Sequence, residues 1–471
     1  MGNELSRVSQ PPAVTGIVLL ACFMGVVVPI YAGIMGDSLA RLAALPALVT
    51  LGILLVFSRK LLFLVILLFR ASGDIFFEST RFSLAGYPIG VGGLINAFVI
   101  LIALLLVVEQ PGILSKKVFT IWGLFLLTAL CGAVVAPVKT DALRLYLQLF
   151  SYFAVFVSAL YVVRSAHDFK FCVRIVLWSS VLPAIYALVD TGLNAGASGI
   201  AEFRVQSTFS HPNIFAFYLT LVIPLALYML KSSSVTLSTG KRLVLTAYMI
   251  FLLALLLLTQ ARSAWVACFA MFAVYGLIFE RRYLVYVVVA PLLALVIPSV
   301  HDRLLDLAVG NEYVLYAKLN SFAWRQLIWK SALQWMEPAH YFLGYGLDSF
   351  KYYAPTFFPL AGGVNWGAHS VYVQLLFEVG AAGLLAFMWL FGRLLWLLRL
   401  MVRVDKLGAF ISIALIVQYL IISLSDNMLA YLSFNWYLFF MLGAACAAVL
   451  TGWKPRPEAS QATRLEHQDS V

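Results

Sequence analysis

Two arginines lie within or just before apolar stretches of the sequence. Arg262 stands between two long apolar runs in LLLLTQARSAWVACF, and Arg204 precedes a predicted helix start at Pro212 and Asn213. A guanidinium at the mouth of a membrane cavity can donate two parallel hydrogen bonds to phosphate oxygens. Alternatively, Arg262 extends its side chain to the membrane interface, and Arg204 is an ordinary loop arginine. Both residues are therefore candidates for binding an anion.

Two histidines lie at predicted helix starts. His369 begins the predicted helix GAHSVYVQLLFEVGAAGLLAF, where a neutral imidazole can accept a proton from a sugar hydroxyl. Tyr372 is expected to share its helical face and is a possible substrate contact, whereas Glu378 lies about half a turn out of phase. His211 follows Arg204 in the same turn; it is a possible substrate contact, with a structural hydrogen bond favoured over catalysis. Position alone leaves both a catalytic and a structural role open for His369.

Two further arginines are possible substrate contacts. Arg144 begins a predicted helix and fits either a phosphate-binding cluster or an anchor at the membrane interface. Arg325 lies near the start of SFAWRQLIWKSALQWM, residues 321–336, a predicted amphipathic helix whose aromatic residues suit the membrane interface. There is no carboxylate pair with metal-ligand spacing, no DxD pattern in an outer loop, no Gly-rich phosphate loop and no HExxH. The sequence therefore predicts no metal or other cofactor, and it disfavours an ATP-driven transporter.

The elements that must position these residues are transmembrane helices. Hydrophobic residues make up 63% of the 471 residues and charged residues only 11%, well below the share of charge in soluble proteins. The apolar residues fall in blocks of about 17–22, which is the length that a helix needs to cross a bilayer. We predict an all-α polytopic membrane protein with about 12–14 transmembrane helices. The predicted spans are 13–34, 38–57, 60–74, 89–108, 118–137, 143–163, 171–190, 213–230, 243–260, 263–279, 283–298, 369–392, 408–425 and 430–450.

The lysines and arginines of the loops predict the topology. They concentrate in alternate loops, and this accounts for the net charge of +11 without a nucleic-acid partner. Both termini are then cytoplasmic and the longest loop is outside. The Gly/Ser/Asn-rich stretch 190–212 is predicted to be a second outer loop. The predicted organisation is a cytoplasmic N-terminus at 1–12, transmembrane helices at 13–298, a long periplasmic loop with the amphipathic helix at 299–368, C-terminal transmembrane helices at 369–450 and a disordered cytoplasmic tail at 451–471.

Four motifs occur in a familiar order around the long outer loop. They are RVQSTFSHPNIFAFYL, TQARSAW, WRQLIWKSAL followed by LGYGLDSF, and AHSVYVQLLFEVGAAGLLAF. In this order they resemble the O-antigen ligase and polymerase superfamily, over roughly residues 200–400. Ser370 stands where many relatives have asparagine.

The resemblance implies a multi-membrane-span (GT-C-like) glycosyltransferase of the bacterial inner membrane that acts at the periplasmic face. It implies an undecaprenyl-diphosphate-linked glycan as donor and a metal-independent reaction. Arg204 and Arg262 match the arginines that bind the donor diphosphate, and His369 matches the catalytic histidine that assists the acceptor hydroxyl.

Several alternatives remain open for the function. A ligase would transfer O-antigen to lipid A-core, and a polymerase would extend O-antigen or exopolysaccharide on a second lipid-linked glycan. A protein O-oligosaccharyltransferase usually has a larger soluble part. A transporter or lipid flippase would also contact membrane lipids through many helices, but internal repeats and broken helices in matching halves are not evident in the sequence.

Overall fold

The computed structural model describes residues 52–450, apart from 53, 56, 80, 85–86, 199–202, 306–309 and 311–318. The predicted span 13–34, most of 38–57 and the predicted tail 451–471 lie outside the described residues. The described elements are α3 (Arg59–Arg70), α4 (Asp74–Ser79), β1 (Arg81–Leu84), β2 (Tyr87–Gly90), α5 (Val91–Glu109), α6 (Lys116–Val135), α7 (Lys139–Val162), α8 (Ala166–Ser179), α9 (Val181–Ser198), α10 (Pro212–Lys231), α11 (Thr239–Leu258), α12 (Arg262–Ile278), α13 (Arg282–Ala294), α14 (Pro298–Leu305), α15 (Ser321–Trp335), α16 (Ser349–Phe357), α17 (Val371–Met401), α18 (Lys406–Ile422) and α19 (Leu432–Leu450), with short 3-10 turns at Pro111–Ile113, Pro338–His340 and Met428–Ala430.

The helices are those of a polytopic membrane protein. In the described part, eight stretches are long and apolar enough to cross a membrane, namely α5, α6, α7, α8 with the start of α9, α10, α11, α17 and α19. Three apolar helices, α12, α13 and α18, are shorter. The predicted all-α membrane fold is thereby confirmed. One small departure is the antiparallel pair of β1 and β2, which the apolar pattern did not predict.

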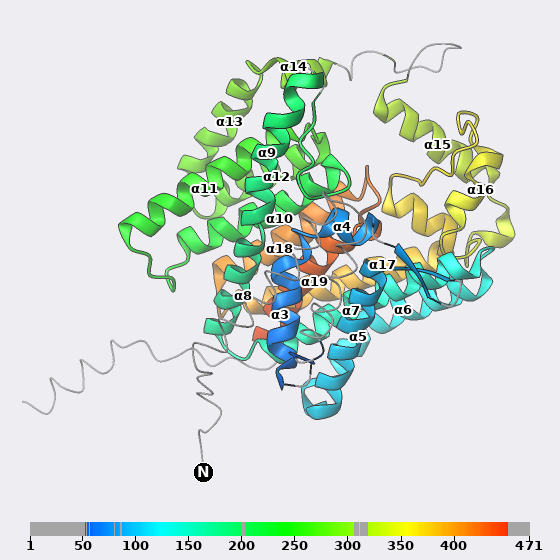
Figure 1. Ribbon diagram of the computed structural model, residues 1–471, viewed down its shortest axis with the longest axis horizontal. Helices are drawn as coiled ribbons and strands as arrows, with labels where there is room; N and C mark the ends of the chain where they lie inside the picture. Colours follow the sequence, from blue (N-terminus) through cyan, green and yellow to red (C-terminus); the bar gives the residue numbers. More distant parts are fainter. Residues whose placement is uncertain are drawn as a thin grey trace, which may run out of the picture.

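The centre of the bundle is formed by α10 and α19 (Figure 1). Both helices are apolar on almost every side and are buried along most of their length, as expected for helices that contact protein all round. They pack against each other and against α18, while α7 and α17 pack on α19. Helices α11, α12 and α13 lie on one side of this centre, and α5, α6 and α7 lie on the other.

One predicted span is interrupted and one predicted loop is wrong. The predicted span 171–190 lies within the apolar stretch Ala166–Leu193, in which α8 ends and α9 begins near Ser180, because Pro183 lacks the N–H that a continuous helix would use. The stretch from 190, predicted to be loop, is helical as far as Ser198. Its leucine and alanine residues are strong helix formers, and they outweigh the glycine and serine.

The long segment 299–368 contains three helices in its described part, rather than the single predicted one. Helix α15 coincides with the predicted helix at 321–336, and α14 and α16 are additional. Helices α15 and α16 pack on the N-terminal part of α17, to one side of the bundle in Figure 1. Ile328, Phe350 and Phe377 belong to a separate apolar core at this contact. Helices α15 and α16 therefore form a folded unit attached to α17.

Helix α17 is broken at Gly380, where φ is +66° and ψ is −170°. The segment 341–347 inserts at this break, and a Cβ at Gly380 would collide with the main-chain carbonyl of Phe342. Main-chain hydrogen bonds join the two segments: Tyr345 N to Phe377 O at 3.0 Å, Gly346 N to Glu378 O at 2.8 Å, Ala381 N to Tyr341 O at 2.8 Å and Ala382 N to Phe342 O at 3.1 Å. These bonds satisfy the backbone groups that the break removes from the helix, so an irregular backbone is tolerated here.

Candidate active site

Three turns with left-handed backbone surround the candidate residues. Ser207 has φ of 57°, Gln260 of 53° and His369 of 48°. Ser207 lies three residues after Arg204, and Gln260 lies two before Arg262. A non-glycine residue in this region is uncommon and unfavourable, and such residues cluster at functional sites. The strain is therefore concentrated in the turns that carry the predicted site residues.

Arg204 is held in place by two neighbouring elements. Its Nε donates to the main-chain oxygen of Thr259 at 2.9 Å, and one terminal nitrogen donates to Asn213 Oδ1 at 2.6 Å. Asp190 supports the same turn, because its carboxylate accepts from the backbone N–H groups of Gln206 and Ser207 at 3.2 and 3.1 Å. The orientation of the guanidinium is thus set by α9, α10 and the end of α11 together.

Arg262 is the first residue of α12 and reaches toward the segment 299–368. Its guanidinium donates to the main-chain oxygen of Arg303 at 3.0 Å and to Ser321 Oγ. Arg303 belongs to α14, and Ser321 begins α15. Arg262 therefore joins the bundle to helices α14 and α15, a contact that its sequence position did not predict.

The positive charges of four arginines act on one another. Burial, together with the charges of Arg303 and Arg262, lowers the pKa of Arg204 to about 10, although the charge of Asp426 acts to raise it. Burial also lowers the pKa of Arg325. The charge of Asp426 raises this pKa, and the charge of Arg303 lowers it. Like charges gathered in a partly buried place repel one another, and an anion bound among them would relieve that repulsion.

Asp426 is the acidic residue whose charge acts on Arg204, Arg325 and His369. Its side chain is only 1% exposed. One oxygen accepts from Asn213 Nδ2 at 2.9 Å, and the other accepts from the hydroxyl of Tyr431. Neither Asp426 nor Arg303 was predicted from the sequence. The available signal for Asp426 was a lone carboxylate between two predicted spans, in SLSDNML.

His369 faces the same group of charges. Burial lowers the pKa of His369, Asp426 raises it, and the positive charges of Arg325 and His211 lower it. The ring of Trp324 stands edge-on to the imidazole, with the ring centroids 5.6 Å apart. The imidazole therefore lies within the fields of one arginine, Arg325, and one carboxylate, Asp426. This is an arrangement suited to accepting a proton close to a bound anion.

The predicted relationship between His369 and Tyr372 is wrong. Helix α17 begins at Val371, so His369 precedes it in a left-handed conformation and shares no helical face with Tyr372. The hydroxyl of Tyr372 donates to the main-chain oxygen of Leu420 in α18 at 2.9 Å. In this structure Tyr372 joins two helices.

His211 caps the start of α10. Its Nδ1 accepts from the backbone N–H of Asn213 at 3.0 Å, which is the structural hydrogen bond that the sequence favoured. Burial and the charge of Arg204 lower the pKa of His211. A neutral imidazole at this position is able to accept that bond.

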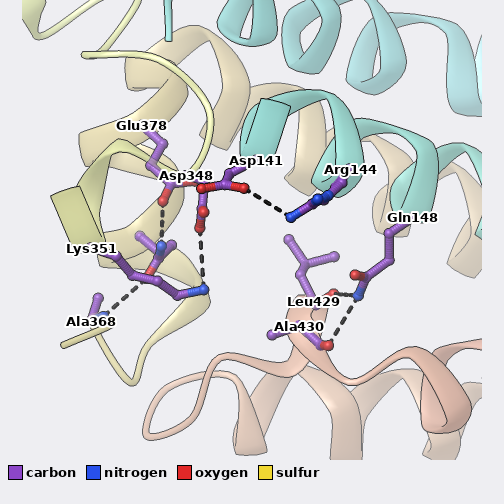
Figure 2. A network of polar contacts seen from close by, with 10 residues as sticks. Asp141, Arg144, Gln148, Asp348, Lys351, Ala368, Glu378, Leu429 and Ala430 are labelled. Atoms are coloured by element: carbon purple, nitrogen blue, oxygen red, sulfur yellow. Dashed lines mark hydrogen bonds and ion pairs between the residues drawn. The ribbon is translucent and has the colours of Figure 1, made fainter. Parts of the chain in front are cut away.

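Arg144 lies apart from the four arginines. It is exposed on the first turns of α7 and pairs with Asp141 at 3.3 Å (Figure 2). Gln148, one turn further, donates to the main-chain oxygens of Leu429 and Ala430 at 3.3 and 3.0 Å. Arg144 therefore borders the connection that carries Asp426, but its structural partner is a surface carboxylate. Among the described residues, no group of three or more His, Cys, Asp or Glu side chains is arranged to hold a metal ion.

Many apolar helices with a cluster of arginines around a histidine and an aspartate define a polytopic membrane protein with a cationic polar site. Residues 247–388 match the O-antigen ligase family. The match confirms the resemblance to the O-antigen ligase and polymerase superfamily, and at a general level it supports glycan transfer of the ligase or polymerase type. Its range includes Arg262, Arg303, Arg325 and His369. A comparison with curated proteins found no match for the chain.

Proposed function

We propose that this protein transfers a glycan from undecaprenyl diphosphate to the hydroxyl of an acceptor sugar. The observation that carries the proposal is a set of interacting charges: Arg262 and Arg303 act on Arg204, Arg303 acts on Arg325, and Asp426 acts on Arg204, Arg325 and His369. The match of residues 247–388 to the O-antigen ligase family supports the reaction class. The site would face the periplasm in the bacterial inner membrane, with both chain termini in the cytoplasm.

The arginines would bind the diphosphate of the donor. Arg325 Nε is buried and has no hydrogen-bond partner among the described residues, so this donor is not used by the protein itself. When the bond between the anomeric carbon and the diphosphate oxygen breaks, negative charge grows on the leaving group. Fixed guanidinium groups stabilise that charge without reorganising, and losing one such donor typically costs about 3 kcal/mol of transition-state stabilisation.

His369 would act as the general base. The acceptor oxygen attacks the anomeric carbon while its proton passes to the imidazole, and the polyprenyl diphosphate departs. The field of Asp426 favours the imidazolium that forms. A single direct displacement inverts the anomeric configuration, so the linkage in the product should be opposite to that in the donor.

The acceptor distinguishes a ligase from a polymerase. We favour lipid A-core as acceptor, which would make the protein an O-antigen ligase. A second lipid-linked glycan as acceptor would make it an O-antigen or exopolysaccharide polymerase by the same chemistry.

The deciding experiment is transfer by the purified protein from an undecaprenyl-diphosphate glycan, with each acceptor supplied separately and EDTA present. His369→Ala and Arg262→Ala should abolish transfer, while His167→Ala, which changes an exposed histidine on α8, should not. Product on lipid A-core supports the ligase, and chain extension supports the polymerase. Binding of the donor without transfer to either acceptor would overturn the proposal in favour of a transporter or flippase.

A further inference from the structure

Both backbone polar groups of Ala368, the residue before His369, are bound by side chains. Ala368 is fully buried. Its backbone N–H donates to Gln374 Oε1 at 2.9 Å, and its carbonyl oxygen accepts from Trp329 Nε1 at 2.6 Å. Both polar groups of this residue are thus paired with side chains instead of with another stretch of backbone. The direction in which the chain enters His369 depends on those two side chains.

The orientation of Gln374 is set by Glu378, one turn further along α17. A backbone N–H can only donate, so the amide atom of Gln374 that faces Ala368 must be the oxygen. The amide nitrogen then points toward Glu378, whose carboxylate oxygen accepts from it. Gln374 and Glu378 are 5% and 1% exposed, so water does not compete for these contacts. Figure 2 shows Ala368 and Glu378 at the two ends of this polar connection.

Glu378 itself is fixed by the break in α17. Its backbone carbonyl accepts from Gly346 N at 2.8 Å, where the segment 341–347 inserts two residues before Gly380. The i to i+4 spacing of Gln374 and Glu378 places their side chains on one helical face. The connection from Glu378 through Gln374 to Ala368 therefore ties the turn of His369 to the insertion.

His369 needs such support because its backbone is left-handed, with φ of 48°. A non-glycine residue keeps this conformation only where its surroundings enforce it. We propose that Gln374 is a positioning residue for His369 and that Glu378 orients Gln374 for this task. The inference rests on the proposed function in so far as His369 serves as the general base. Releasing Ala368 would let the peptide relax and would move the imidazole from the acceptor hydroxyl.

The kinetic test compares substitutions that remove the connection with one that preserves it. Gln374→Leu should lower kcat by about 10- to 100-fold, as expected for a misplaced catalytic group, and leave the KM for the donor nearly unchanged. Glu378→Gln keeps an acceptor oxygen and should retain most of the activity, whereas Glu378→Leu should lose it. Gln418→Leu is the matched control, because Gln418 is a buried amide (2% exposed) in α18 that donates to Ala267 O.

A second measurement does not depend on catalysis. Diethyl pyrocarbonate modifies accessible imidazoles, and its rate at His369 can be read by mass spectrometry of the intact, folded protein. That rate should change in Gln374→Leu and Glu378→Leu but remain as in the unsubstituted protein in Glu378→Gln and Gln418→Leu.

The two measurements separate the inference from the function on which it rests. If the unsubstituted protein transfers no glycan but the reactivity of His369 still follows this pattern, the positioning role stands and the proposed function fails. If Gln374→Leu and Glu378→Leu keep both the normal kcat and the normal reactivity of His369, the positioning role is wrong. A loss of activity in Glu378→Gln as large as in Glu378→Leu would equally overturn it.

Discussion

Arg204 Nε donates to the main-chain oxygen of Thr259, 2.9 Å away, and so joins the loop before α10 to the turn that leads into Arg262. Two further hydrogen bonds join the same two segments, from Val205 N to Leu258 O and from Gln260 Nε2 to Phe203 O, both at 3.2 Å, so arginines that are 58 positions apart in the sequence (262 − 204) are tied to neighbouring turns. Because Asn213 accepts from the same guanidinium and donates to Asp426, this contact also reaches the acidic centre of the site.

The shape of the guanidinium at position 204 should matter as well as its charge. Arg204→Lys keeps the charge but cannot donate to Thr259 and Asn213 in the same geometry. We expect kcat/KM to fall by roughly 10- to 100-fold, measured as initial rates of glycan transfer. Arg242→Lys, an exposed arginine on α11, should have no effect. Full activity in Arg204→Lys would mean that only the charge is used.

The activity should decline at acidic pH with a midpoint below the usual pKa of histidine. Burial and the charges of Arg325 and His211 lower the pKa of His369 from 6.5, so the neutral base persists to lower pH. Activity is therefore present above this lowered pKa and is lost as pH falls through it. Arg325→Met removes a charge that lowers the pKa, so the acid limb of kcat against pH should move to higher pH.

Lys330→Met removes an exposed cation from the same helix and should leave the acid limb where it was. An acid limb that moves to lower pH in Arg325→Met would contradict the assignment of His369 as the titrating base.

The negative charge of Asp426 should weaken binding of the donor but accelerate the chemical step. Asp426→Asn keeps oxygen and nitrogen atoms near Asn213 and Tyr431 but removes the negative charge. The donor diphosphate would then be repelled less, while the imidazolium of His369 would lose its stabilising field. We expect the KM for the donor and kcat to fall by roughly 10-fold each. Asp302→Asn, at an exposed carboxylate of α14, serves as control; a rise in KM in Asp426→Asn would refute this account.

The break in α17 should not tolerate a side chain at its glycine. Gly380→Ala places a Cβ against the carbonyl of Phe342 and forces a positive φ on alanine. Such strain typically costs at least about 1–3 kcal/mol, so the thermal unfolding midpoint of the purified protein should fall by several degrees. Gly392→Ala, in the same helix, meets no atom within 4 Å and should be neutral or slightly stabilising. Equal midpoints for the two variants would show that the insertion is dispensable.

Much of the helical framework is predictable from sequence because its cause is local. A run of apolar residues long enough to cross a bilayer must satisfy its own backbone hydrogen bonds, whatever the rest of the chain does. Helices α5, α6 and α10, which correspond to the predicted spans 89–108, 118–137 and 213–230, follow from this rule. Isolated charges in such a sequence are costly, which is why Arg204 and Arg262 stand out as candidates from the amino-acid sequence alone.

The tertiary structure decided which of these residues act together. The sequence separates Asp426 from His369 by more than fifty residues, and only the packing of α10, α17 and α18 brings its charge to bear on the imidazole. The break at Gly380 was equally invisible, since the glycine lies in an apolar run that is typical of one continuous helix. Long-range contacts with the segment 341–347 satisfy the backbone there. The sequence by itself determined which residues are candidates for a functional site. Contacts between residues far apart in the chain determined which of those candidates come together, because a local sequence pattern carries no information about distant partners.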